Sequence, residues 1–116
     1  MSIIFVVLGV LVSGLWVVDG DTIHKDFHKY RMATYDTPEY YPRAWWQAEH
    51  DLAVKATARL AELITQCGHE IVPLGKSCKY GRECAILKIG GKDVAERAVA
   101  EGWGQYWNGK RPKPDW

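Results

Sequence analysis

One long amphipathic segment constrains the fold of this 116-residue chain more than any other part of the sequence. Between residues 45 and 67, apolar side chains recur every three or four positions and polar side chains fall on the opposite side, which predicts one helix of about six turns. A helix with one apolar face needs a second layer to cover it, and we expect that layer to be a sheet. We expect Gly68 to end the helix. The apolar positions are Trp45, Ala48, Leu52, Ala56, Leu60, Leu63 and Cys67.

Short strand patterns lie on both sides of this helix. Residues 15–23 predict a strand, an acidic turn and a second strand, and Gly20 would give the turn its backbone freedom. Residues 29–35 predict the next strand. After the helix, residues 69–74 and 83–89 predict a hairpin whose eight-residue connection, residues 75–82, is basic.

The last third of the chain predicts a short helix and a tail. Asp93, followed three residues later by Glu96, has the spacing of a capping box, so we expect a helix from Val94 to Glu101. Gly102 would stop that helix. Residues 103–116 are aromatic and then basic, and we expect a docked or extended tail with no regular element.

The first fourteen residues allow two interpretations. Residues 3–18 carry no charge, and residues 3–12 have the length of the apolar core of a signal peptide, so residues 1–14 are either an export signal or anchor or an extension of the first strand. In the first case the protein would be secreted, periplasmic or anchored by its N-terminus, and in the second it would be cytoplasmic. Residues 15–116 are long enough for one domain and too short for two.

Charge and cysteine content limit the classes of function. The net charge of +1 gives no global basic field, so any attraction to phosphate must be local. Cys67, Cys78 and Cys84 have no C-x-x-C spacing and cannot all pair within the chain, so their pairing and the redox compartment stay open and a zinc site is disfavoured. His24 and His28 lie four residues apart but have no suitable third ligand nearby, so we interpret them as surface histidines.

The stretch from Tyr30 to Glu39 contains the parts needed to hydrolyse a phosphodiester. Arg31 is always charged and can bind a phosphate through two hydrogen bonds, and Asp36 is a hard oxygen donor suited to a divalent cation. Glu39 could act as a general base or orient a water. A straight strand would put Arg31 and Asp36 on opposite faces, so we predict a bend or a strand end between them, to which Pro38 contributes.

Four separated motifs follow one another along the chain. They are Asp19-Gly-Asp21-Thr22, Arg31 with Asp36-Thr-Pro-Glu39, Lys79-Tyr80-Gly-Arg82, and Asp93-Val-Ala-Glu with Gly102. In this order and at this spacing they resemble the staphylococcal nuclease (thermonuclease) family. The likeness covers residues 15–107. It implies an α+β, mainly β fold, a five-stranded OB-fold barrel with two packed helices. It also implies a calcium-dependent phosphodiesterase that cuts DNA and RNA and leaves 3′-phosphate ends. We expect a monomer with no protein partner.

The resemblance also implies roles for individual residues. Asp21 and Asp36 would hold the calcium ion together with the backbone carbonyl of Thr37, and Asp19 would lie close by. Glu39 would orient or deprotonate the attacking water.

Cationic residues of the same motifs would bind the substrate. Arg31 and Arg82 would grip the scissile phosphate, and Lys79 and Tyr80 would contact the nucleotide. The alternative from the residues alone is that both arginines form surface salt bridges. The link from residue 22 to residue 31 is shorter than in the best-known members, and their paired tyrosines have no clean match, although Tyr106 or Trp107 could stack on a base.

A second function stays open beside the nuclease. Folds of this kind also occur as catalytically silent modules that bind nucleic acid or protein, because a fold does not determine a function. A silent module would have no reason to keep Glu39 together with both arginines. We expect the loop of residues 79–82 and the tail of residues 110–113 to contact phosphates, although the tail could equally be a solvated basic end.

Overall fold

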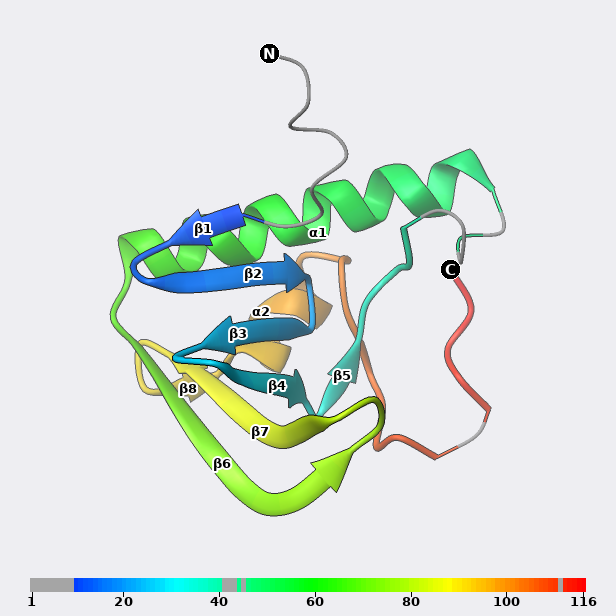
Figure 1. Cartoon of the computed structure of the whole chain (residues 1–116). Coiled ribbons are helices and arrows are strands. Elements are labelled where there is room, and N and C mark those ends of the chain that lie inside the picture. Colours follow the sequence, from blue (N-terminus) through cyan, green and yellow to red (C-terminus); the bar gives the residue numbers. More distant parts are fainter. Residues whose placement is uncertain (1–9, 41–43, 45, 111) are drawn as a thin grey trace.

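The computed structural model describes residues 10–40, 44, 46–110 and 112–116 (Figure 1). The strands that precede the long helix are β1 (Val10–Val12), β2 (Leu15–Asp19), β3 (Thr22–Lys25), β4 (His28–Met32) and β5 (Tyr35–Asp36). The remaining elements are α1 (Gln47–Gln66), β6 (His69–Cys78), β7 (Arg82–Ile89), β8 (Lys92–Asp93), α2 (Val94–Ala100) and β9 (Gln105–Tyr106).

Most strands belong to one sheet, in the order β1-β2-β3-β4-β7-β6, with β8 paired to β7. The β4–β7 pair is parallel and the other pairs are antiparallel. The short strands β5 and β9 form a separate antiparallel pair. Among the described residues, β6 does not pair back onto β1 and the sheet stays open. The α+β class, rich in strands and with two helices, is therefore confirmed, whereas the closed five-stranded barrel is not.

The core lies between the sheet and the two helices. Strand β2 alternates as expected for a half-buried strand, with Leu15 and Val17 fully buried and Trp16 partly exposed. Leu60 of α1 and Leu87 of β7 are also fully buried, and each such side chain contributes roughly 1.5 to 3 kcal/mol. In Figure 1, α1 runs along the β1 and β2 side of the sheet, with which it makes its contacts.

The long helix is confirmed, but its buried face is rotated from the predicted one. Ala48 is exposed, whereas Glu49 is buried; Trp45 lies outside the described residues. The helix ends at Gln66 because Cys67 already has an extended backbone, with φ −123° and ψ 150°. The helix thus ends two residues before Gly68, close to the predicted stop, and Gly68 itself does not have a positive φ. The chain instead passes directly into β6.

The predicted eight-residue loop after β6 was also wrong. Strand β6 continues to Cys78 and β7 begins at Arg82, so only residues 79–81 connect them. Two features permit the longer hairpin. The register shifts between Pro73 and Ser77, where Gly75 has φ +72°, and a disulfide joins Cys78 to Cys84.

The ends of the domain differ from their predictions in smaller ways. The second helix is confirmed, with the Asp93 side chain accepting a hydrogen bond from the Ala95 N–H at 2.9 Å and with φ +83° at Gly102. The tail is not without regular structure, since β9 pairs with β5. Residues 1–9 of the predicted signal or strand extension lie outside the described residues, while β1 pairs with β2. In the part of the chain that the structure describes, no helix is long and apolar enough to cross a membrane.

Candidate active site

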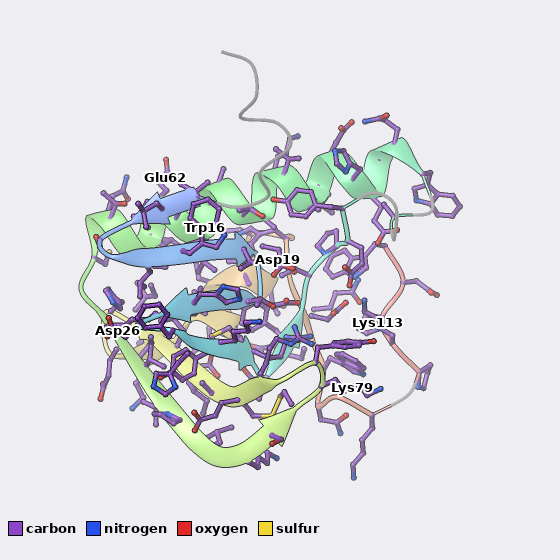
Figure 2. The ribbon with its side chains drawn as sticks, viewed as in Figure 1. Trp16, Asp19, Asp26, Glu62, Lys79 and Lys113 are labelled. Atoms are coloured by element: carbon purple, nitrogen blue, oxygen red, sulfur yellow. A yellow bond between two sulfur atoms is a disulfide. The ribbon has the colours of Figure 1, made fainter. Side chains whose placement is uncertain are left out.

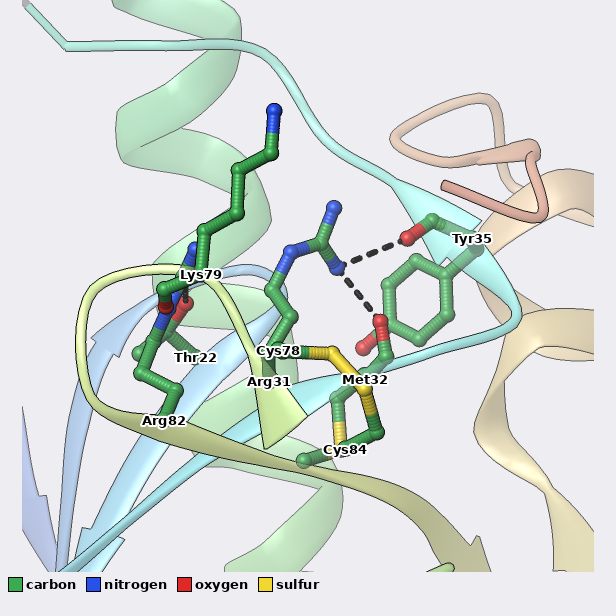
Figure 3. The surroundings of a disulfide bond; sticks show 8 residues. All are labelled: Thr22, Arg31, Met32, Tyr35, Cys78, Lys79, Arg82 and Cys84. Carbon is green, nitrogen blue, oxygen red and sulfur yellow. Dashed lines mark hydrogen bonds between the residues drawn. A yellow bond between two sulfur atoms is a disulfide. The ribbon is translucent and has the colours of Figure 1, made fainter. Parts of the chain in front are cut away.

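A bend between β4 and β5 brings the predicted cation and carboxylate together. The single strand predicted over residues 29–35 is interrupted, because β4 ends at Met32 and β5 begins at Tyr35. Arg31 Nη2 lies 3.3 Å from Asp36 Oδ1, so the predicted bend is confirmed. Arg31 Nη1 donates to the carbonyls of Met32 at 2.5 Å and Tyr35 at 2.9 Å (Figure 3). The guanidinium therefore holds both ends of the bend.

Asp21 is the centre of a buried hydrogen-bond network. Its Oδ2 lies 3.3 Å from Arg31 Nη2 and accepts hydrogen bonds from the Thr37 backbone N–H at 3.1 Å and the Thr37 hydroxyl at 3.0 Å. Its Oδ1 accepts from the Thr22 hydroxyl at 3.2 Å. The Asp21 N–H donates to Asp19 Oδ1 at 3.0 Å. The structure thus brings together all the residues to which the resemblance assigned the calcium ion.

The turn that carries Asp21 is pressed against α1 and the segment after β5. A Cβ atom on Gly20 would lie 2.7 Å from Thr37 Cγ2 and 3.0 Å from Ala56 Cβ. The buried Tyr35 hydroxyl donates to the Gly20 carbonyl at 2.7 Å. Glycine is therefore needed here for close approach, and the prediction that it supplies a special turn conformation was wrong, because its φ is not positive.

Burial makes negative charge costly on the carboxylates of the site. Removal from water raises the pKa of Asp36 to about 6, although the Trp116 hydrogen bond acts in the opposite direction. Burial and the neighbouring Asp21 raise the pKa of Asp19 well above its ordinary value. Asp21 and Asp36 share the guanidinium of Arg31, and Asp19 lies beside them through its hydrogen bond with the Asp21 backbone N–H.

Such a cluster of hard oxygen atoms fits a calcium ion, which prefers carboxylates, carbonyls and water. Asp21 and Asp36 could hold the ion with the Thr37 carbonyl, and Asp19 would add negative charge nearby. Among the described residues, no three His, Cys, Asp or Glu side chains are grouped closely enough to hold a metal ion by themselves. Carbonyl, water or substrate oxygens would have to complete the coordination.

Glu39 lies beside these carboxylates but contacts a different cation. Lys113 Nζ lies 2.5 Å from Glu39 Oε1 and 3.7 Å from Asp36 Oδ1. The Trp116 indole N–H donates to Asp36 Oδ2 at 2.9 Å. Burial lowers the pKa of Lys113, but its hydrogen bond to Glu39 and the charge of Asp36 outweigh this effect and raise it overall. Lys113 is therefore not part of a merely solvated tail.

Arg82 reaches the site through Thr22. Its Nη1 donates to the Thr22 hydroxyl at 3.0 Å, and Thr22 in turn donates to Asp21. Its Nε donates to the Lys79 carbonyl at 2.9 Å, and its guanidinium lies 5.5 Å from the centre of the Tyr80 ring. Two of the Arg82 contacts are therefore hydrogen bonds to a hydroxyl and a carbonyl oxygen, and one is a contact with an aromatic ring.

A cleft of about 350 Å³ connects the two arginines. Its lining includes Arg31, Lys79, Arg82 and Trp107, together with the disulfide at the base of the hairpin. In Figure 3 the side chains of Arg31 and Lys79 extend in the same direction, from β4 and from the loop after β6. Trp107 stacks against Arg31, with 5.8 Å between the guanidinium carbon and the ring centre. Tyr80 is mostly exposed and does not line this cleft.

Several residues of the site were not found from the sequence. Thr22 was quoted only as part of a motif, although it links Arg82 to Asp21. Glu49 accepts the Glu39 backbone N–H at 3.0 Å through Oε2. An acidic residue at helical spacing from the buried Ala53 and Ala56 is the signal that could have revealed it. Trp116 had no recognisable signal, because nothing local indicates where a tail docks.

Comparison of the chain with protein-family models and with curated proteins found no match.

Proposed function

We propose that this chain is a calcium-dependent nuclease that hydrolyses phosphodiester bonds in DNA and RNA and leaves 3′-phosphate ends. The observation that supports it most is the convergence of Arg31, Asp21 and Asp36, with both carboxylates 3.3 Å from one guanidinium nitrogen, beside a cleft that Arg82 also lines. The proposal includes the fold that the resemblance implies, a five-stranded OB-fold barrel.

The carboxylates would hold the metal. Asp21 and Asp36 would bind calcium with the Thr37 carbonyl, and Asp19 would strengthen the negative field around them. The bound ion would supply positive charge to a phosphoryl oxygen and lower the pKa of a neighbouring water. Asp36 is almost entirely buried and its pKa is raised, so a divalent cation would relieve the cost of its charge.

The arginines would bind the phosphate group. Nη1 of Arg31 contacts the bend and Nη2 contacts Asp21 and Asp36, so Nη2 could donate to a phosphate oxygen once calcium has taken those carboxylates. Arg82 would approach from the start of β7, the strand that pairs with β4, directly after the loop that supplies Lys79 and Tyr80. Negative charge on the phosphoryl oxygens grows in the transition state, and fixed cations stabilise it more than they stabilise bound substrate.

Glu39 would accept the proton of the attacking water or orient that water. It is only partly buried, and its backbone is held by Glu49 at the start of α1. This position gives its carboxylate access to solvent while its chain segment stays fixed. Lys113 would have to leave Glu39 before that carboxylate could serve as a base.

Digestion of defined single- and double-stranded DNA and RNA, in calcium and in EDTA, tests the proposal. We expect cleavage in calcium only, with ends that a phosphatase converts to 3′-hydroxyls. Arg82→Ala should lose on the order of 10² to 10³ in rate while the protein still folds. Arg97→Ala is the matched control, because Arg97 is an exposed arginine on α2 that pairs with Glu101. If purified Arg82→Ala cut DNA at the parent's rate, the assignment would be wrong.

A catalytically silent nucleic-acid-binding or protein-binding module is the second candidate. The observation that favours it is the cover that Lys113 and Trp116 place on Asp36 and Glu39. A module of this kind would retain nucleic acid in a gel-shift assay and cleave it in neither calcium nor EDTA.

A further inference from the structure

The tail lies across the carboxylates of the candidate site. Trp116 donates its indole N–H to Asp36 Oδ2, and Lys113 lies 3.7 Å from Asp36 Oδ1, which also faces Arg31. Both oxygens of Asp36 therefore have cationic or N–H neighbours. The same Lys113 ammonium lies 2.5 Å from Glu39, the proposed base. Figure 2 labels Lys113 on the tail and Asp19 at the end of β2.

Other contacts fix the path of the tail. Gln105 donates from its side-chain amide to the Asp115 carbonyl at 2.7 Å, and the Trp46 indole donates to the Trp116 carbonyl at 3.3 Å. In Figure 1 the tail, in red, runs back past β5 toward the N-terminal end of α1. These contacts come from β9 and from the residue that precedes α1, so two different segments hold the end of the tail.

The chemistry of the tail complements the carboxylates of the site. Asp21 and Asp36 share the guanidinium of Arg31, and the tail brings an ammonium group to Asp36 and Glu39 and an indole donor to Asp36. An ammonium group is a compact positive charge with N–H donors, and a carboxylate oxygen that faces it is hindered from binding a metal ion.

We propose that the segment Lys113–Trp116 binds Asp36 and Glu39 as an internal ligand, so that it competes with the divalent cation for Asp36 and covers the proposed base Glu39. This inference rests on the proposed calcium site. When the segment is docked, Asp36 and Glu39 both face N–H donors of the tail. When calcium is bound, the segment must release Asp36. When the segment has released Asp36 in only a fraction of the molecules, the apparent dissociation constant for calcium rises by the inverse of that fraction.

Calorimetric titration of the full chain with calcium tests the competition. Trp116→Phe keeps an aromatic ring but removes the N–H donor, and Lys113→Gln removes the charge. We expect each variant to bind calcium about tenfold more tightly than the parent. This factor corresponds to a parent protein in which the tail has released Asp36 in roughly one molecule in ten. Lys110→Gln is the matched control, because it removes a tail charge for which no ion pair occurs among the described residues, and its affinity should not change.

A second measurement follows the tail itself. In a two-dimensional NMR spectrum of the ¹⁵N-labelled protein, the Trp116 indole N–H peak, assigned by its absence from Trp116→Phe, should move as calcium is added. The peak should move in Lys110→Gln at the same calcium concentrations as in the parent.

The outcomes separate this inference from the proposed function. Tighter calcium binding by both variants with no cleavage of nucleic acid would support the competition and contradict the nuclease. Equal affinities in parent and variants, with a Trp116 peak that does not move, would overturn the competition and leave the nuclease standing. If neither parent nor variants bind calcium, both the competition and the calcium site are wrong.

Discussion

Asp36→Asn should stabilise the protein above pH 6 in the absence of calcium. The Asp36 side chain is almost fully buried, and burial raises its pKa from the ordinary 3.8 to about 6 even though Trp116, Lys113 and Arg31 favour its charged form. This rise in the pKa of Asp36 corresponds to a loss of about 3 kcal/mol in the free energy of unfolding above pH 6. Asparagine has the shape of the protonated acid without its charge, so it avoids most of this cost.

The sign follows from proton binding. Between pH 3.8 and about 6, the folded state binds the Asp36 proton more strongly than the unfolded state, so stability falls as pH rises through this window and stays lower above it. The raised pKa of Asp19 acts in the same direction, whereas the lowered pKa values of His24 and His69 act in the opposite one. These contributions cancel when the variant is compared with the parent at each pH.

Urea denaturation in EDTA, at a series of pH values from 3.5 to 8, measures the effect. The variant should be about 2 to 3 kcal/mol more stable than the parent at pH 8, and the difference should shrink to about zero below pH 4. If Asp36→Asn is instead less stable than the parent at pH 8, the ion pair with Arg31 outweighs the burial cost. The description of Asp36 as a carboxylate kept at a cost in stability would then be wrong.

Two further predictions concern the segments that position the site. Gly20→Ala should lower the free energy of unfolding, measured by urea denaturation, by about 1 to 3 kcal/mol, because the new methyl group would lie 2.7 Å from Thr37. In the control Gly68→Ala the new methyl group meets nothing within 4 Å, so its stability should stay within about 1 kcal/mol of the parent. Equal effects of the two substitutions would contradict the close-approach explanation. The double variant Cys78→Ser, Cys84→Ser should lower the free energy of unfolding by roughly 2 kcal/mol, because a short closed loop is lost. It should also raise KM for oligonucleotides more than it lowers kcat. An unchanged KM would show that the disulfide does not position the loop of residues 79–81.

The sequence was most informative where a pattern is local or carries its own geometry. The period of α1, the cap at Asp93 and the bend after Arg31 all follow from residue spacing, and the structure bears them out. The acidic turn before β3 was also predicted at the correct position.

The errors arose where distant parts of the chain decide the outcome. Gly20 is a glycine because Thr37 and α1 approach it, which no local pattern can show. The hairpin of β6 and β7 is longer than predicted, and a disulfide whose pairing the sequence left open spans its end. The contacts of Trp116 with Asp36 join residues 80 positions apart, so the cover on the candidate site could not be inferred from composition or spacing.

Cleavage of one end-labelled single-stranded DNA, with parent and Glu39→Gln compared in calcium and in EDTA, tests the central claim most directly. We predict cleavage by the parent in calcium only, with products that end in 3′-phosphate, and a rate at least about 10² lower for Glu39→Gln. Cleavage by the parent that is equally fast in EDTA, or an unchanged rate for a folded Glu39→Gln, would contradict the proposed nuclease site.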